Sequence, residues 1–379
     1  MNTDFDFAIC GAGPVGLALA ALLVKRGVTP SHIALFDAKT LEQASQDPRS
    51  IALSYGSQQM LQELGAWPIA AMAIHQIHVS RRGHFGRTFI DRAEYQLPAL
   101  GYVTRYGSLV AALARAVTRV GVNVIRPVQM LSTSEHAEYV ECMLDDGRTI
   151  STGVLVQAEG GVFSEQIAKR LQRDYEQIAI VAHVRTSAPI AHRAFERFTD
   201  EGPLALLPQD DGYALVWCTH PTNAAQLTAL TDADFLRALE QAFGGRLGRF
   251  IGTTKRNQFP LGLNAHPVTS ARSVAIGNAA QTLHPVAGQG LNLGLRDASV
   301  LARLLISDSP QSAIARFAET QQLDRKLTIR LTDTMARAFA SAPSGSLSQS
   351  LLGFSLGLID AFKPAKRLLA EQMMFGLRQ

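Results

Sequence analysis

Cysteine is scarce in this sequence, and its placement excludes two classes of small domain. The 379 residues include only three cysteines, Cys10, Cys142 and Cys218, which are far apart and form no Cys-x-x-Cys pair. A disulfide framework needs an even, closely spaced set, and a zinc site needs clustered ligands. We therefore predict no disulfides and no metal, which is typical of a protein of the reducing cytosol.

Long apolar runs are also missing near the start of the chain. The run 15–24 stops at Lys25, and it is about half the length of roughly twenty residues that a membrane span needs. Asp4 and Asp6 precede it, where a secretory signal would have basic residues. The sequence thus predicts no transmembrane helix and a cytoplasmic location.

Charge of one sign is not concentrated anywhere in the chain. Lysine and arginine total 36 against 32 acidic residues, and no basic run occurs, which argues against nucleic acid binding. Hydrophobic residues make up 47% of the chain, enough to bury a sizeable core. The length is sufficient for two packed domains.

The first 37 residues have the pattern of a βαβ unit around a glycine loop. An apolar strand over 5–10, a helix over 14–26 that Pro14 opens, and a second strand over 33–36 follow one another. Between strand and helix stands the motif GxGxxG, at Gly11, Gly13 and Gly16. Gly11 permits a tight turn, Gly13 lets a pyrophosphate approach the backbone, and Gly16 lets helix and strand pack closely.

An acidic residue completes this constellation. Asp37 ends the second strand, where a carboxylate can accept hydrogen bonds from ribose hydroxyls. The N-terminus of the helix supplies free N–H groups and a positive dipole end for phosphates. The unit therefore predicts a dinucleotide cradle, although the motif alone does not separate FAD from NAD.

A second glycine-rich turn lies far down the chain. A strand over 274–276 leads into a loop of small residues, and a helix begins near Gly290. The residues that we expect to approach a cofactor here are Gly277, Asn278, Pro285, Gly288, Gly290, Leu291 and Asn292. A flavin needs such a second site, since its pyrophosphate must be held and negative charge develops on its ring upon reduction.

The middle of the chain has a different pattern of predicted secondary structure. Short strands predicted over 178–184, 193–199, 204–207 and 213–219 are typical of an antiparallel sheet, and a helix is predicted over 232–243. The fold class is therefore α/β plus α+β: a Rossmann-type unit with an inserted sheet and a helical tail. We assign 1–75, 98–176 and 270–335 to an FAD-binding domain, 76–97 and 177–269 to a substrate domain, and 336–379 to a helical C-terminal region.

Taken together, these segments resemble a known family. The two glycine motifs are similar to the flavin-binding motifs of the hydroxylases of the para-hydroxybenzoate hydroxylase type. The segments 47–53, 193–198 and 202–205 resemble the ubiquinone-biosynthesis branch, most closely the 2-polyprenyl-6-methoxyphenol hydroxylases. The similarity runs along nearly the whole chain and is weakest in the tail.

The resemblance implies further cofactor contacts. Arg49, the arginine of a D-x-R segment, would lie near the flavin, or else pair with Asp47 at the surface; Arg105 would make another flavin contact. Two positions depart from the family pattern: Glu159 stands where it usually has aspartate, and Asn278 replaces a second aspartate. We therefore predict moderate FAD affinity.

The resemblance also implies a reaction, hydroxylation of a polyprenyl phenol by O2 through a flavin C4a-hydroperoxide. NAD(P)H or a partner reductase would donate electrons transiently, because a second Rossmann motif is missing. No catalytic base stands out, and His284 is a weak candidate. The segment 351–367 is a candidate amphipathic helix for peripheral contact with the inner membrane face, or else an ordinary packed helix. Other ubiquinone-biosynthesis proteins are possible partners, and a homodimer is a further expectation.

Three alternatives stay open at this point. One is an FAD-dependent reductase of the same superfamily without oxygen chemistry. Another is a non-catalytic assembly subunit with weakened flavin binding, which Glu159 and Asn278 keep in consideration. The last is an NAD(P) dehydrogenase, against which the distal glycine turn argues.

Overall fold

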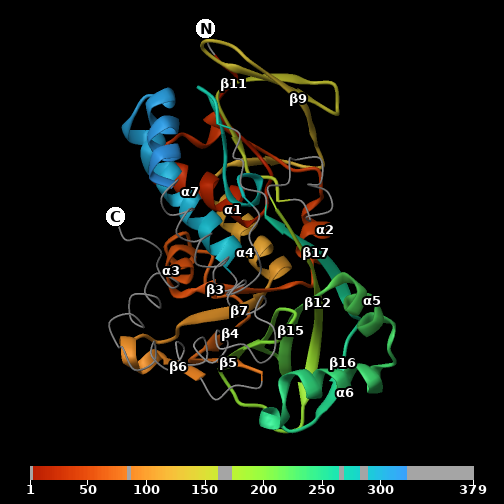
Figure 1. Cartoon of the computed structure of the whole chain (residues 1–379). Coiled ribbons are helices and arrows are strands. Elements are labelled where there is room, and N and C mark those ends of the chain that lie inside the picture. Colours follow the sequence, from red (N-terminus) through yellow and green to blue (C-terminus); the bar gives the residue numbers. More distant parts are fainter. Residues whose placement is uncertain (1–2, 83–86, 161–172, 264–268, 282–288, 322–379) are drawn as a thin grey trace.

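The computed structural model describes residues 3–82, 87–160, 173–263, 269–281 and 289–321. Over these residues the chain forms three sheets with helices packed around them (Figure 1). One unit, with α1, α4 and α7, lies toward the top of the view. The other, with α5 and α6, lies at the bottom (Figure 1). The chain passes between the two units more than once, because strands from separate stretches meet in the same sheet.

The first sheet is built on the predicted βαβ unit. Its strands are β1 (Phe5–Cys10), β2 (Ile33–Phe36), β8 (Asn123–Ile125), β9 (Met130–Glu135), β10 (Val140–Leu144), β11 (Thr149–Gln157) and β18 (Ser273–Ala275). The pairs β8–β2, β2–β1, β1–β11 and β11–β18 are parallel, whereas β9 and β10 extend β11 as antiparallel strands. Every residue of β2 is buried, as expected for a parallel strand that is covered on both faces.

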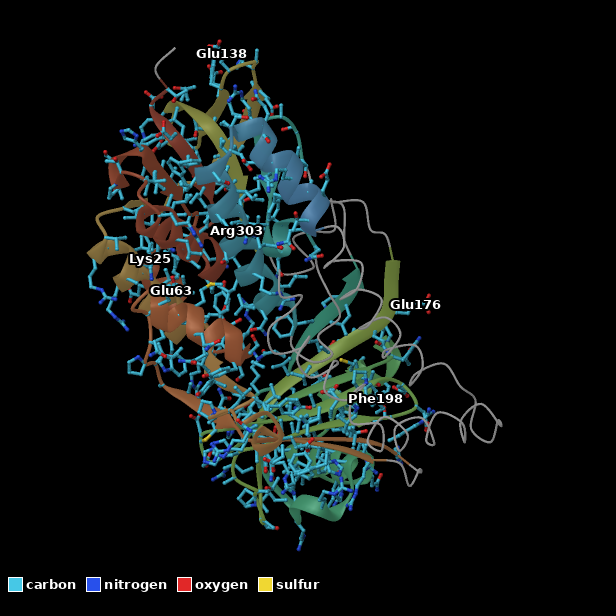
Figure 2. All side chains as sticks on the ribbon, turned by 90° about the vertical axis from the view of Figure 1, so that its left-hand side faces the viewer. Lys25, Glu63, Glu138, Glu176, Phe198 and Arg303 are labelled. Carbon is cyan, nitrogen blue, oxygen red and sulfur yellow. The ribbon has the colours of Figure 1, made fainter. Side chains whose placement is uncertain are left out.

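Three helices pack against one face of this sheet. They are α1 (Pro14–Lys25), α4 (Tyr106–Arg119) and α7 (Gln289–Ser307), and their alanine and leucine side chains form one core with the strands. Small side chains let α1 lie close to both α4 and α7. Gly27, with φ of 102°, follows α1 in the left-handed conformation that glycine favours at helix ends. Lys25 at this end forms an ion pair of 2.8 Å with Glu63, and Figure 2 shows the two side by side.

A small sheet connects the two units. It contains β3 (Ser50–Ser54), β4 (Ala71–Ile74) and β7 (Gly101–Arg105), with β7 in the middle and antiparallel to both neighbours. The short helices α2 (Leu41–Ser45) and α3 (Tyr55–Glu63) flank β3 in the chain. The short 3-10 turns are η1 (Pro30–His32), η2 (Arg92–Tyr95), η4 (Gly245–Leu247) and η5 (Gly277–Ala279).

The third sheet has eight strands and forms the lower unit. Its strands are β5 (Gln76–Arg81), β6 (Arg87–Asp91), β12 (Arg173–Thr186), β13 (Arg193–Phe198), β14 (Pro203–Gln209), β15 (Gly212–Thr219), β16 (Phe250–Thr253) and β17 (Asn257–Leu263). The helices α5 (Pro221–Ala229) and α6 (Asp232–Phe243) cover one of its faces with an aromatic and aliphatic core. The other face contacts the small sheet through Ala194 and Leu207.

The predicted fold class is confirmed, and the structure corrects one detail of the inserted sheet. The four predicted middle strands do pair in antiparallel fashion, but β5 joins β13 in parallel. β5 comes from an earlier stretch of the chain. The long connection from β5 to β13 allows the two strands to run in the same direction. A hairpin turn at Asp146 and Gly147, a residue pair that favours such turns, joins β10 to β11.

The end of the predicted tail lies outside the described residues. Residues 310–321, which precede it, are helical. Within the described ranges, no helix is long and apolar enough to cross a membrane. All three cysteines are buried and free.

Candidate nucleotide-binding site

The glycine loop after β1 leaves its backbone open to a ligand. Gly11 has φ of 103°, and a Cβ there would stand 2.7 Å from the Glu159 nitrogen. A Cβ at Gly16 would stand 1.9 Å from the Gly11 oxygen, so only glycine allows α1 to approach the loop. Pro14 is the first residue of α1, and no side chain caps this helix at Gly13. The N-terminal N–H groups are thus available to an anion.

Asp37 braces this loop from the end of β2. One carboxylate oxygen accepts a hydrogen bond of 2.8 Å from the Ala12 N–H, and the other accepts one of 2.8 Å from the Lys39 N–H. The buried guanidinium of Arg126 lies 3.9 Å from the same carboxylate and donates to the Ala12 carbonyl. Burial lowers the pKa of Arg126, and Asp37 opposes that shift. The loop is therefore held at both its N–H and its carbonyl.

Tyr106, at the start of α4, forms another wall of the loop. Its hydroxyl would stand 3.0 Å from a Cβ at Gly13, and the guanidinium carbon of Arg49 lies 4.9 Å from its ring centre. Burial raises the pKa of Tyr106 to about 12, with Arg49 opposing the shift. The phenol is therefore neutral at physiological pH and can donate a hydrogen bond toward the loop.

Arg49 has the partner that the surface alternative names. Its Nη2 lies 2.6 Å from Asp47 Oδ2, and its Nε lies 3.0 Å from both carboxylate oxygens. Burial raises the pKa of Asp47, but the hydrogen bonds from Arg49 outweigh burial and the net shift is downward. This pair stands beside Tyr106, so a flavin contact by Arg49 stays a prediction.

Arg105 lies farther out, where the two units meet. Its Nη2 forms an exposed ion pair of 2.6 Å with Asp210, in the turn between β14 and β15. Gln209, the last residue of β14, accepts a hydrogen bond of 2.7 Å from the Ser50 hydroxyl. Arg105 therefore ties the end of β7 to the eight-stranded sheet, and its predicted flavin contact remains a prediction.

The second glycine motif meets the first. Gly277 has φ of 59°, and a Cβ there would stand 3.2 Å from the Val15 side chain. A Cβ at Gly294 would stand 2.8 Å from the same valine. The close approach brings the turn after β18 and the first turns of α7 against the first turn of α1.

Asn278 and Glu159 join this meeting point. A Cβ at Gly160 would lie 3.7 Å from Asn278 Cβ, and one at Gly290 would lie 3.9 Å from Asn278 Oδ1. The exposed Glu159 follows β11, and its carboxylate accepts a hydrogen bond from the buried Cys10 thiol. Burial raises the pKa of that thiol, and Glu159 adds to the shift.

Asn292, in the first turns of α7, uses its side chain inside the protein. Its Oδ1 accepts hydrogen bonds of 2.8 Å from the Ser54 N–H and 2.7 Å from the Ser57 hydroxyl, and its Nδ2 donates to the Ala52 carbonyl at 3.0 Å. The side chain thus anchors α7 to the turn between β3 and α3. Leu291 packs against the core.

The remaining predicted residues cannot be placed. His284, Pro285 and Gly288 lie outside the described residues. In the part of the chain that the structure describes, no group of three or more His, Cys, Asp or Glu side chains is placed to hold a metal ion.

The sequence did not identify Tyr106 and Arg126 as residues of the site. Asp47 was named only as a surface partner of Arg49. Tyr106 follows Arg105 in the chain, which is the only local signal for it. Arg126 stands before a proline at the end of a short strand, and nothing in its neighbourhood indicates that it reaches Ala12. Both act through contacts made more than ninety residues away in the chain.

Comparisons with known proteins agree with this geometry. The family model described as "FAD binding domain" matches residues 4–329. An uncharacterized protein of Synechocystis is 31% identical over 99% of this chain and 94% of its own. Ubiquinone hydroxylase UbiL of Rhodospirillum rubrum is 29% identical over 98% of this chain and 90% of its own.

A solved structure shows the same fold. The p-nitrophenol 4-monooxygenase PnpA of Pseudomonas putida superposes with a TM-score of 0.77, at 16% identity, with both chains fully covered. At this identity the likeness concerns the arrangement of the sheets and helices alone.

Proposed function

The chain belongs to the FAD-binding domain family, in the group of FAD-dependent hydroxylases of ubiquinone biosynthesis. From that premise we propose that it hydroxylates the ring of a polyprenyl phenol. The coarser activity, that of an FAD-dependent monooxygenase, rests on the family match and the relatives. The finer elements, which are the prenylated substrate and the 2-polyprenyl-6-methoxyphenol specificity, are the proposal. The name of the relative UbiL supports a quinone precursor as the substrate class.

The observation that carries this proposal is the meeting of two distant glycine motifs. The loop at Gly11 and the turn at Gly277 approach each other across Val15, and both open toward a helix N-terminus. A single nucleotide cradle needs only the first motif, whereas a flavin dinucleotide spans both. Donors and small residues at both places fit FAD better than a transient nicotinamide.

We assign the FAD contacts accordingly. The pyrophosphate would lie against the N-terminus of α1, and Asp37 would accept hydrogen bonds from the adenosine ribose while it keeps those from the Ala12 and Lys39 N–H groups. The residues assigned to the cofactor are Gly11, Gly13, Pro14, Gly16, Asp37, Arg49, Arg105, Glu159, Gly277, Asn278, Pro285, Gly288, Gly290, Leu291 and Asn292. We also propose the division into an FAD-binding domain, a substrate domain and a helical C-terminal region, with the bounds given from the sequence.

The protein's own residues have three tasks in the reaction. When bound, the flavin supplies reducing equivalents and activates O2 for insertion into an electron-rich ring. Asn292 holds the start of α7 in place, so that the backbone donors of this helix face a developing negative charge. Tyr106, Asp37 and Arg126 fix the loop that positions the cofactor. The eight-stranded sheet provides the apolar surface on which a phenol ring is held away from water.

Oxygen consumption is the first test. Protein loaded with FAD is mixed with NADPH, or with a flavin reductase and NADH, and with a short-chain 2-prenyl-6-methoxyphenol. We expect O2 uptake that depends on the phenol and incorporation of one atom from labelled O2 into the product. Substrate reduction under anaerobic conditions would instead support the reductase alternative. An absence of bound flavin after reconstitution would support the non-catalytic subunit.

The same material tests the setting of the reaction. We propose a cytoplasmic enzyme whose substrate tail remains at the inner membrane face, working beside other ubiquinone-biosynthesis proteins and as a homodimer. Flotation with liposomes of the full chain and of a chain ending before residue 336 tests the membrane contact of the tail. Equal flotation of both would contradict it.

A further inference from the structure

One row of side chains crosses the eight-stranded sheet and remains half-buried. The strand register places these residues beside one another on five neighbouring strands. They are Val79, Glu196, Ala205, Val216 and Val181, in that order. Five strands at their usual spacing give the row a length of roughly 19 Å. It is long enough for an aromatic ring and the first part of a prenyl chain.

Buried side chains border the row on both sides. On one side lie Arg81, Phe198 and Cys218, all buried. On the other side Ala194 and Leu207 are covered by the small sheet. We call this half-buried row between buried neighbours the trough, and its side chains are apolar apart from Glu196.

This trough faces the nucleotide-binding unit. The alternate residues of the same strands, such as Phe195 and Leu206, pack under α5 and α6 on the opposite face. Figure 1 shows α5 at the right and α6 at the bottom of the molecule, both away from α1 and α7. The small sheet that borders the trough also contains β3, whose end Asn292 binds. The trough and the cofactor site therefore share a border.

Glu196 is the one ionisable side chain in this row. No hydrogen bond or ion pair joins its carboxylate to any residue that the structure describes. Burial alone raises its pKa to about 8. The ionisable groups that face it are the Cys218 thiol on β15, whose pKa burial and Glu196 both raise, and Arg81 on β5, which lies in the next row. A carboxyl that has lost much of its water and has no donor from the protein is costly, unless a ligand supplies the donor.

We propose that Glu196 accepts the proton of the substrate's phenolic hydroxyl while the ring lies in the trough. The phenol O–H bond breaks, the proton moves to a carboxylate oxygen of Glu196, and the electron pair stays on the phenolate oxygen. That pair raises the electron density of the ring carbons that receive the hydroxyl group. After hydroxylation the substituted ring carbon releases its proton, which goes into the water formed from the second atom of O2, and the proton on Glu196 returns to the phenolate oxygen of the product. This inference rests on the proposed function, since it names the group that prepares its substrate.

Its test separates recognition of the phenol from turnover. FAD-loaded wild type, Glu196→Gln and Glu141→Gln are titrated with a short-chain 2-prenyl-6-methoxyphenol and with its methyl ether, which has no phenolic proton. Binding is followed by flavin fluorescence. Glu141 is an exposed glutamate on β10, so its substitution is the matched control.

At about pH 9, where Glu196 is ionised, we expect wild type and the control to bind the phenol about tenfold more tightly than the ether, which corresponds to one hydrogen bond to a charged group. Glu196→Gln should bind both compounds with the affinity that wild type has for the ether. In turnover, kcat/KM of wild type should rise with pH through about 8, and this limb should be missing in Glu196→Gln.

Equal discrimination by wild type and Glu196→Gln would overturn the inference, while phenol-dependent O2 uptake would leave the proposed function standing. Wild type that binds neither compound, with FAD retained, would overturn both. A Glu196→Gln protein that retains FAD as wild type does shows that the fold is intact, so a loss of discrimination then belongs to the carboxylate.

Discussion

The carboxylate of Asp37 accepts a hydrogen bond of 2.8 Å from the backbone N–H of Ala12, so the acid that ends β2 holds the glycine loop in shape. Its second oxygen binds the Lys39 N–H, also at 2.8 Å. A residue expected to contact a ribose therefore also fixes the cradle before any ligand arrives. Because binding to a preorganised site loses less entropy, the loop should lose affinity when this carboxylate is removed.

Asp37→Ala should weaken FAD binding by roughly tenfold to a hundredfold, since hydrogen bonds to charged groups contribute about 1.5–3 kcal/mol. Titration of the FAD-free protein with FAD, followed by fluorescence quenching, measures the change. Asp146→Ala removes an exposed carboxylate from the hairpin between β10 and β11 and serves as the control. An unchanged dissociation constant in Asp37→Ala would contradict the bracing role.

Gly16→Ala should abolish FAD retention and lower the melting temperature. The new Cβ would stand 1.9 Å from the Gly11 oxygen, so either α1 or the loop must move. Gly245→Ala is the matched control, because a Cβ there meets nothing within 4 Å. Differential scanning fluorimetry with and without FAD compares the two. Equal melting curves for both variants would show that the loop can shift at little cost.

Asn292→Ala should destabilise the protein by about 2–4 kcal/mol, since it leaves the Ser54 N–H, the Ser57 hydroxyl and the Ala52 carbonyl without this partner. Urea unfolding followed by circular dichroism measures the free energy. Asn257→Ala, at an exposed position of β17, is expected to change it by less than about 0.5 kcal/mol. A neutral Asn292→Ala would mean that water replaces the amide in this contact.

Glu196 should also make stability depend on pH. Its folded pKa of about 8 lies above its ordinary value of 4.5, so the folded state keeps a proton that the unfolded state releases. The resulting stability is fully present below pH 4.5 and is lost as pH rises through 8. Glu196→Gln should therefore gain stability over wild type as pH rises across this window, on the order of 5 kcal/mol at its upper end. Urea unfolding at several pH values measures the free energy of unfolding of both proteins. A constant difference between wild type and Glu196→Gln at every pH would contradict the raised pKa.

Local patterns predicted the first half of the site well. The glycine loop, α1 and β2 follow one another within 37 residues, and each is specified by its own sequence: buried strands, a proline at the helix start and a glycine at its end. The hairpin at Gly147 is equally local. Such elements need no tertiary information, because turn chemistry and apolar periodicity determine them.

Contacts between distant segments could not be predicted in the same way. Tyr106 reaches Gly13, Arg126 reaches Ala12, and β5 enters its sheet parallel to β13, all through packing that joins separate stretches of the chain. The half-buried row around Glu196 depends on the register of five strands, which the alternation of single strands does not fix. Arg49 shows the converse, because its short-range pair with Asp47 was already among the alternatives.

Glu159 should limit how tightly the protein holds FAD. The resemblance places aspartate at this position, and the longer side chain reaches the Cys10 thiol, which donates a hydrogen bond to its carboxylate. Glu159→Asp withdraws the carboxylate from Cys10 and leaves it free to accept from a ribose hydroxyl. We expect FAD affinity to rise about fivefold, the equivalent of one ordinary hydrogen bond. Glu141→Asp, on β10, should leave the affinity for FAD unchanged.

Extensive dialysis followed by the ratio of flavin to protein absorbance measures how much FAD is retained. Wild type should lose part of its FAD, and Glu159→Asp should lose less. Wild type that keeps one FAD per chain would contradict the moderate affinity predicted from Glu159 and Asn278.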